Sequence, residues 1–296
     1  MKNNSILVVN PISGDVDKAE LIDAATVFAA KENLNLIIYN TSGVSDIENI
    51  KVLYKTYKPE RIIVAGGDGT IKMVAEAMEA HDVIIGILPA GSANGLAVDL
   101  NLPSTIEENL EIAFHNDYIE MDMIAINGKK SIHLSDLGVN AEMIKNYENS
   151  SIRGKWGYAI QTFTTLIDLD APFTAKITGD FDTIECTARM IVIANSQKYG
   201  TGVSINPNGV MDDGKFELVI LKNLDLIVLG KIISGNMPVE LEDVEIISTD
   251  KAVVTTNVPV SFQIDGEYCG TETKLNIEIL PKQLKVAIPN LNNSVI

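Results

Sequence analysis

The sequence predicts an α/β domain with a parallel sheet, followed by a second, mainly antiparallel β domain. Three observations support this fold class. Strand-like and helix-like segments alternate through the first third of the 296 residues, which is typical of parallel sheets covered by helices. After about residue 120 short β-rich runs dominate, and Asn127-Gly128 between two of them is a strong hairpin signal. The apolar fraction of 46% is enough for a sizeable core.

In the first domain, we expect strands at 5–10, 34–39, 61–65 and 83–88. Helices are expected at 16–31, from residue 45 onward, at 70–80, and from about residue 104 to residue 114. Ser45 with Glu48, and Ser104 with Glu107, have the spacing of capping boxes, which mark helix starts. This order predicts a doubly wound parallel sheet, in which ligands bind beyond the carboxyl ends of the strands.

The second domain is expected to consist mostly of short strands. Strand-like runs occupy 118–126, 131–137, 173–178, 183–193, 216–221, 244–248, 252–256, 258–264 and 275–280, and helical patterns occur at 156–167 and 224–235. We therefore divide the chain into domains at 1–124 and 125–280, followed by a segment at 281–296. The last apolar run, 284–288, would suit either domain, and we expect the segment to pack back on the first.

Three glycine-containing loops, 10–14, 66–70 and 89–94, follow strands of the predicted parallel sheet and should meet at one edge of it. The most informative is Gly66-Gly67-Asp68-Gly69-Thr70. Its glycines permit positive φ and the close approach of a bulky ligand, and the helix that follows offers free N–H groups to an anion. We interpret the loop as a phosphate site, with Asp68 in a Mg²⁺-linked role. Each loop alone could be an ordinary turn, but three at one edge support each other.

Composition argues against several classes of protein. A net charge of −17 is unfavourable for binding nucleic acid. Neither the Gly-x4-Gly-Lys-Ser/Thr phosphate loop nor the Gly-x-Gly-x-x-Gly fingerprint occurs. We see no signal peptide and no apolar run long enough to span a membrane, so we expect a cytoplasmic protein, at most peripheral at a membrane. The two cysteines should be reduced, and His81, His115 and His133 should lie on the surface or in loops.

Seven motifs along the chain carry a family resemblance. They are Asn10-Pro-Ile-Ser-Gly14, Gly66-Gly-Asp-Gly-Thr70, Leu88-Pro-Ala-Gly-Ser-Ala-Asn94, Leu137-Gly-Val-Asn-Ala-Glu142, Ala194-Asn-Ser-Gln-Lys-Tyr-Gly200, Met211-Asp-Asp-Gly-Lys-Phe216 and Ile264-Asp-Gly-Glu267. Together they resemble the diacylglycerol kinase catalytic family, which includes bacterial soluble lipid kinases, sphingosine kinases and ceramide kinases. The Gly-Gly-Asp-Gly element also occurs in NAD kinases and phosphofructokinases, whereas the third and last motifs are more specific for lipid kinases. The resemblance covers nearly the whole chain.

The resemblance implies a fold, two cofactors and a set of binding residues. The fold would be an α/β nucleotide domain like that of NAD kinases and phosphofructokinases and a C-terminal antiparallel β-sandwich, with catalysis in the cleft between them. ATP and Mg²⁺ would be the cofactors, and Asp68 would organise the Mg²⁺ and the phosphates. The residues implied to contact ATP are Asn10, Pro11, Ser13, Gly14, Thr41, Gly66, Gly67, Asp68, Gly69, Thr70, Ser92 and Asn94.

The resemblance also implies catalytic and structural acids in the second domain. Glu267 stands at the position of the proton acceptor, with Asp265 beside it, and Asp122 matches an acid of the catalytic network. Asp265 and Glu267 lie two apart at a strand end, so an extended backbone would aim both at one face; without context, the pair could be an ordinary acidic turn. A structural Mg²⁺ would be held by the Asp213 carboxylate and the backbone carbonyls of Val210 and Lys215.

The chain departs from the family pattern at two positions. Gly95 stands where the family commonly has an acid, and Lys72 stands where it often has asparagine. We expect an ATP- and Mg²⁺-dependent kinase for the hydroxyl of a lipid, such as diacylglycerol or a sphingoid base, with an apolar rim or local basic patch for the membrane surface. We allow for a homodimer. The alternatives are a kinase for a soluble acceptor such as NAD and, because of Gly95, a non-catalytic nucleotide- or lipid-binding protein.

Overall fold

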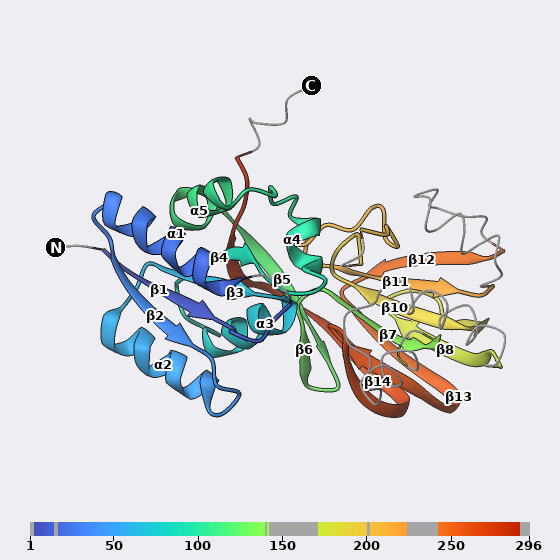
Figure 1. Cartoon of the computed structure of the whole chain (residues 1–296). Helices are drawn as coiled ribbons and strands as arrows, with labels where there is room; N and C mark the ends of the chain where they lie inside the picture. Colours follow the sequence, from blue (N-terminus) through green and yellow to red (C-terminus); the bar gives the residue numbers. More distant parts are fainter. Residues whose placement is uncertain are drawn as a thin grey trace, which may run out of the picture. The chain divides into compact units, whose positions relative to one another are not determined.

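The computed structural model describes residues 3–14, 17–139, 141, 171–199, 202–223 and 242–290. The chain divides into two compact units: Met1–Met121 together with Lys282–Ile296, and Asp122–Pro281. We call them the N-terminal unit and the C-terminal unit (Figure 1). The predicted helices at 156–167 and 224–235 lie outside the described residues, as do Glu142 and Gly200 of the motifs.

The N-terminal unit is a parallel sheet with helices on both faces (Figure 1). Its strands, in the order β14-β4-β3-β1-β2, are β1 (Asn4–Val9), β2 (Asn35–Asn40), β3 (Arg61–Gly66), β4 (Ile84–Pro89) and the end of β14 (Glu267–Ala287). Helices α1 (Lys18–Lys31) and α5 (Ile106–His115) pack on one face, and α2 (Asp46–Tyr57) and α3 (Asp68–Ala77) pack on the other. Helix α4 (Gly95–Asp99) follows β4. The predicted α/β class is confirmed.

The central strands of this sheet are buried on both faces, which explains their continuous apolar sequences. Leu7 and Ile63 belong to a core cluster that also contains Leu88 of β4 and Phe114 of α5. The apolar run at 284–288 contributes to the same sheet, because Lys285 and Val286 pair in parallel with β4. This end of β14 therefore belongs to the N-terminal unit.

Neither capping box forms at the residues that were predicted. Ser45 has φ +54 and makes no side-chain cap. The neighbouring Asp46 caps the preceding turn instead, and its carboxylate accepts from the backbone N–H groups of Ser42 and Gly43 at 3.0 and 2.7 Å. The second box forms one residue later than predicted, between Thr105 and Glu108. At the second box the neighbouring residue Thr105 takes the capping role, whereas at the first box Asp46 binds the turn before the helix.

The named elements of the C-terminal unit are antiparallel strands, and Val139 and Ala141, just after β7, are helical. Its strands are β5 (Tyr118–Ile126), which crosses from one unit to the other, β6 (Lys129–Ser131), β7 (Leu134–Gly138), β8 (Phe173–Gly179), β9 (Ile184–Ala188), β10 (Met190–Ala194), β11 (Phe216–Leu221), β12 (Val244–Thr249), β13 (Lys251–Ile264) and most of β14. The order is β12-β11-β10-β7-β13-β14, with β8 and β9 added beside β13. Residues from β8, β10, β11 and β13 share one core, as the predicted sandwich requires.

Three strand predictions differ from the structure, two because a predicted run is split between strands with different partners and one because two runs join. The run 183–193 is split: β9 pairs with β8, while β10 pairs with β7 and β11. The runs 252–256 and 258–264 form one strand, β13, with a register shift between Thr255 and Val260. The run 131–137 is split between β6 and β7. The hairpin at Asn127-Gly128 is confirmed, with φ of +48 and +80 at its two turn residues.

Candidate functional site: three joined loops and a set of held carboxylates

The loops 10–14, 66–70 and 89–94 follow β1, β3 and β4 of the N-terminal unit. These strands are adjacent and parallel, so the loops lie at one edge of the sheet, as predicted. Hydrogen bonds and backbone contacts join each loop to the other two.

The first loop is joined to the second by Asn10. Its backbone N–H donates to the Ala65 carbonyl at 3.0 Å, and its side-chain amide donates to the Thr70 hydroxyl at 3.1 Å. Thr70 lies in the first turn of α3, where its N–H donates to the Gly67 carbonyl. Asn10 and Thr70, both predicted to bind ATP, therefore fix each other.

The first loop is joined to the third by Ser13, Gly14 and Lys18. The Ser13 hydroxyl donates to the Ala90 carbonyl at 3.0 Å. The Lys18 ammonium donates to the same carbonyl at 3.0 Å and to the Ser13 carbonyl at 2.6 Å. Gly14 has φ +53, and a Cβ there would lie 2.7 Å from the carbonyl carbon of Gly91. The backbones of the two loops are thus in contact.

Lys18 is a buried cation that the sequence analysis missed. It is the first residue of α1, where the helix dipole disfavours a positive charge. A lysine at the first position of an otherwise regular helix indicates that its ammonium group interacts with a group outside the helix. Here it brings a positive charge among loops of a strongly acidic chain.

The second loop is joined to the third through glycines and Asp68. A Cβ on Gly91 would overlap the Cα of Gly67. The Asp68 carboxylate accepts from the backbone N–H groups of Gly95 and Leu96 at 2.7 and 2.9 Å, at the start of α4. The Asn94 side chain accepts from the Gly91 N–H at 2.7 Å and folds its own loop. Asp68 therefore fixes the third loop.

The positive φ that glycine permits is not used by Gly66, Gly67 or Gly69. None of them is among the described residues with positive φ, and Gly67 has φ −100. Gly66 and Gly67 serve close packing instead, because a Cβ on Gly66 would lie 2.6 Å from the Cβ of Thr70 and a Cβ on Gly67 would lie 3.0 Å from the Cα of Gly91. Gly69 has open space around it.

The remaining predicted ATP residues also lie near this edge of the sheet. Thr41 follows β2, and its N–H donates to the Val9 carbonyl at 2.8 Å. Pro11 and Ser92 are exposed on the first and third loops. The structure thus brings the predicted binding residues of the N-terminal unit together.

Asp265 and Glu267 do not share one face of an extended strand, and that prediction is wrong. Asp265 and Gly266 are the two turn residues between β13 and β14, with φ of +49 and +86, and Glu267 pairs with Ile264 across the turn. The Asp265 carboxylate accepts from the Ser131 hydroxyl at 2.8 Å and from backbone N–H groups. Glu267 is exposed.

The other acids of the C-terminal unit also hold backbone groups. Asp122 is fully buried, and its carboxylate accepts from the Gly214 N–H at 2.7 Å. Asp213 accepts from the Lys215 N–H at 3.0 Å, and Val210 is exposed close by in the chain. Asp122 and the proposed Mg²⁺ segment are thus directly joined.

No group of three or more His, Cys, Asp or Glu side chains suited to a metal occurs in the part of the chain that the structure describes. The predicted Mg²⁺ site needs only one carboxylate and two carbonyls, so it would not form such a group. Oxygen ligands of this kind are those that Mg²⁺ prefers, and the site at Asp213 stays a prediction.

His133 lies in a loop, as the prediction of a surface or loop position allows, but it is buried. Its backbone N–H donates to the Asp265 carboxylate at 3.0 Å. It lies in the link between β6 and β7 that the Asp265 turn covers, which explains its burial. His115 is exposed, and His81 is half-buried.

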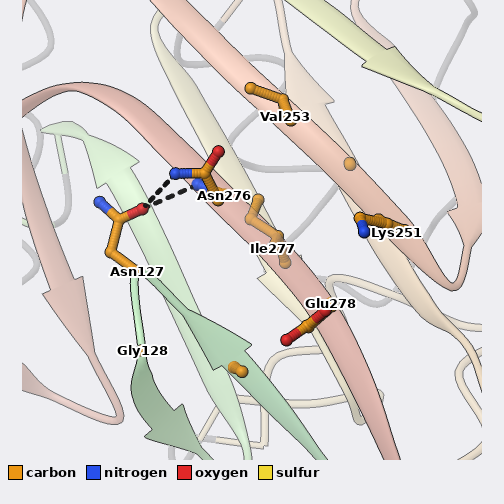
Figure 2. A pocket seen from close by; sticks show the side chains of 9 residues that line it. Asn127, Gly128, Lys251, Val253, Asn276, Ile277 and Glu278 are labelled. Atoms are coloured by element: carbon orange, nitrogen blue, oxygen red, sulfur yellow. Dashed lines mark hydrogen bonds between the residues drawn. The ribbon is translucent and has the colours of Figure 1, made fainter.

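A hollow of about 340 Å³ opens on the C-terminal unit between residues of β13 and β14 and the β5–β6 hairpin. Figure 2 shows the side chains of Asn127 and Asn276 joined across it by hydrogen bonds. The Asn127 oxygen also accepts from the Asn276 N–H at 2.8 Å. None of the predicted site residues lines this hollow, and its two asparagines fasten the hairpin to β14.

Within the described residues, no helix is both long and apolar enough to cross a bilayer.

Comparisons with known proteins agree with this architecture. The chain is 26% identical over 293 residues to a probable lipid kinase YegS of Escherichia fergusonii, covering 96% of each protein. It is 27% identical over 236 residues to the lipid kinase YegS of Escherichia coli K12, covering 77% of this chain and 78% of the relative. A solved diacylglycerol kinase from Bacillus anthracis superposes with a TM-score of 0.74 at 19% identity, covering 99% of this chain and 98% of that one.

The family assignment follows from both units. Residues 4–126 match the diacylglycerol kinase catalytic domain, and residues 135–288 match the YegS C-terminal NAD kinase beta sandwich-like domain. The chain belongs to the diacylglycerol kinase catalytic-domain family, in the form that carries this C-terminal β-sandwich.

Proposed function

We propose that the protein is a lipid kinase that uses ATP and Mg²⁺ to phosphorylate the hydroxyl group of a lipid such as diacylglycerol or a sphingoid base. The observation that carries this proposal is the joined set of three loops in the N-terminal unit, where Gly67 and Gly91 are in backbone contact. Membership of a kinase family supports phosphate transfer, and the names of the curated relatives support a lipid acceptor.

In this proposal the three loops bind the triphosphate. Phosphoryl transfer depends mainly on positioning and on stabilising negative charge. Asn10, Ser13 and Asp68 fix the loops to one another, so the backbone N–H groups at the start of α3 are held in place before ATP binds. Mg²⁺, when bound, neutralises charge on the phosphates.

Glu267 is proposed to accept the proton of the lipid hydroxyl. The hydroxyl oxygen forms a bond to the γ-phosphorus, the bond from that phosphorus to the ADP oxygen breaks, and the hydroxyl proton passes to the Glu267 carboxylate. Glu267 is exposed, so its carboxylate is accessible to an acceptor. Asp265 is proposed to hold the turn in front of Glu267, since its carboxylate already accepts three or more hydrogen bonds.

We propose that the protein acts in the cytoplasm as a peripheral protein at the inner membrane face. A net charge of −17 does not favour anionic lipid headgroups, so an apolar contact is the more favourable way to reach a lipid. Ile12 on the first loop is 86% exposed and is a candidate for such a contact.

The experiment is transfer of labelled phosphate from ATP to a panel of diacylglycerol, sphingosine, ceramide and NAD, with the lipids in mixed micelles. We expect a lipid to be labelled, and we expect Glu267→Gln to slow transfer about 10²–10⁴-fold. Glu272→Gln is the matched control, because Glu272 is an exposed acid on the same strand; it should transfer at the wild-type rate. Label in NAD alone would identify a soluble acceptor. ATP binding without transfer would identify a non-catalytic protein.

A further inference from the structure

We propose that Gln263 and Asp136 are positioning residues that hold the turn in front of Glu267 in the geometry needed for proton transfer. The inference rests on the proposed role of Glu267. It concerns two buried residues of the C-terminal unit that no motif singles out as functional.

The position of Glu267 depends on a two-residue turn. Asp265 and Gly266 both have positive φ, and the first residue after them is Glu267. The position of an exposed carboxylate at the end of such a turn is fixed only if the conformation of the turn is fixed. A misplacement of about 1 Å of a catalytic group can cost roughly 10²-fold in rate.

Hydrogen bonds hold both residues of the turn. The Asp265 carboxylate is fastened to Ser131 and to the following backbone N–H groups. The Gly266 N–H, one residue before Glu267, donates to the side-chain oxygen of Gln263 at 2.7 Å. Gln263 is 1% exposed, so this second hydrogen bond is made by a buried side chain.

Asp136 determines which way the Gln263 amide points. The two residues are direct neighbours on β13 and β7, and the Gln263 amide nitrogen donates to the Asp136 carboxylate at 2.5 Å. A carboxylate can only accept hydrogen bonds. The nitrogen of the Gln263 side chain must therefore face Asp136, which leaves its oxygen facing the Gly266 N–H.

Packing alone does not explain why an acid stands at position 136, because burying a carboxylate costs free energy. Asp136 is fully buried, and its strand neighbour Leu137 is apolar. A buried carboxylate is usually less favourable than an apolar side chain of similar size. The Tyr199 hydroxyl also donates to Asp136, at 3.4 Å. Burial, and then the Asp136 charge and hydrogen bond, raise the pKa of Tyr199 well above its ordinary value, so the phenol stays a donor.

The first test separates positioning from general stability. Gln263→Met keeps the size of the side chain and removes both amide groups. We expect kcat for the best lipid of the panel, diacylglycerol being the first probe, to fall about 10–100-fold while the KM for ATP stays within about twofold, because the ATP loops lie in the other unit. Asp136→Leu should act in the same way. Asp136→Asn can still present an oxygen to Gln263 and should keep most of the rate.

A double-mutant cycle shows whether Gln263 acts through Glu267. In a Glu267→Gln background, we expect Gln263→Met to lower kcat no further, because the group that it positions is already inactive. Equal losses in both backgrounds would overturn the inference and leave the role of Glu267 intact. Full activity of Glu267→Gln alone would instead overturn the proposed role of Glu267, and the positioning role with it.

Hydrogen exchange of the Gly266 amide gives a readout that needs no activity. Exchange at Gly266 should become at least about tenfold faster in Gln263→Met and Asp136→Leu and should stay near the wild-type rate in Asp136→Asn. Unchanged protection of Gly266 in Gln263→Met would show that Gln263 does not hold the turn, and it would overturn the inference.

Discussion

The loops of the N-terminal unit are bonded to one another, whereas the acids predicted for the site in the C-terminal unit, Asp122, Asp213 and Asp265, each accept hydrogen bonds from separate backbone groups. In the first unit, Gly67 and Gly91 touch, and Asp68 bridges two loops. In the second, Asp122 and Asp265 each accept N–H groups of a neighbouring turn or link. A change in one loop should therefore disturb the whole phosphate site, while a change in one acid should act locally.

The comparison also separates residues that hold the site from residues that are accessible to substrates. Lys18 and Asp136 are buried. Glu267 and Ser92 are exposed. Substitutions of the first kind should lower activity by loosening the groups that these side chains hold, and for Lys18 they should lower stability as well. Substitutions of the second kind should change activity at nearly constant stability.

The largest expected effect comes from adding a methyl group between two loops. In Gly91→Ala the new Cβ would overlap the Cα of Gly67 and lie 2.9 Å from the Asn94 side-chain oxygen. The loops must separate, so we expect kcat/KM for ATP to fall about 10²–10³-fold. ATP titration by calorimetry, together with labelled phosphate transfer, measures the loss.

A second glycine provides a control for the fold. Gly69 lies in α3 with nothing within 4 Å of an added Cβ. Alanine is favoured over glycine within a helix by about 0.5–1 kcal/mol, so Gly69→Ala should keep or raise Tm while Gly91→Ala lowers it. Wild-type ATP affinity in Gly91→Ala would contradict the backbone contact between the loops.

The second prediction compares substitutions of two neighbouring acids of the C-terminal unit. Asp265→Gly keeps the positive φ of the turn and removes the carboxylate that holds Ser131 and His133. We expect the free energy of unfolding to fall by about 2–3 kcal/mol, since hydrogen bonds to a charged group are lost. Glu267→Ala should change the free energy of unfolding by less than about 0.5 kcal/mol and still abolish most phosphate transfer.

Urea unfolding and transfer assays on the two variants measure this contrast. Equal stability losses would mean that Glu267 is also part of the packing of the turn. No stability loss in Asp265→Gly would mean that its hydrogen bonds are replaced by water without cost.

The sequence was sufficient to predict that the loops lie at one edge of the sheet, but not which residues of the loops are in contact. Adjacent parallel strands place 66–70 and 89–94 at one edge by topology alone. The contact of Gly67 with Gly91 depends on tertiary distances, and no local pattern encodes it. For the same reason the sequence could not show that Gly67, with φ −100, is needed for this contact and not for the positive φ that glycine permits.

Local signals failed where two neighbouring residues could play the same part. Ser45 and Asp46 are both residue types that cap helices, but Ser45 makes no side-chain cap and Asp46 accepts from Gly43 in the turn before the helix. Asp265-Gly266 was interpreted as part of an extended strand end, although Asp-Gly between apolar runs is also a hairpin signal. Lys18 and the Gln263 network could not be found from periodicity, because their contacts join segments far apart in the chain.

The third prediction concerns the buried cation that joins the first and third loops. Lys18→Met keeps the apolar stem and removes the ammonium that donates to the Ser13 and Ala90 carbonyls. We expect a loss of about 1–2 kcal/mol in the free energy of unfolding and about tenfold weaker ATP binding, since the two loops are less firmly joined. Lys31→Met is the control. Lys31 is exposed at the other end of α1, and its removal should change stability by at most about 0.5 kcal/mol.

The smallest expected effect lies outside the loops, at Asp46, the first residue of α2, and it depends on pH. Burial alone would raise the pKa of Asp46, but hydrogen bonds from Tyr39, Ser42 and Gly43 outweigh it and lower that pKa. A lowered folded-state pKa means that ionised Asp46 stabilises the fold above its ordinary pKa of about 3.9, and that this stability is lost as the pH falls through the folded-state value.

Asp46→Asn should therefore lower the free energy of unfolding by about 1 kcal/mol at pH 7. The difference from the wild type should shrink as the pH falls below about 4. Tyr39→Phe removes one donor, the hydroxyl 2.6 Å from the carboxylate, so it should give a smaller loss in the same direction. Urea unfolding of the three proteins at pH 7, 5 and 3.5 measures the trend. A stability difference that grows toward acid pH would mean that Asp46 is neutral in the folded protein, and the cap would then have to be a protonated carboxyl group.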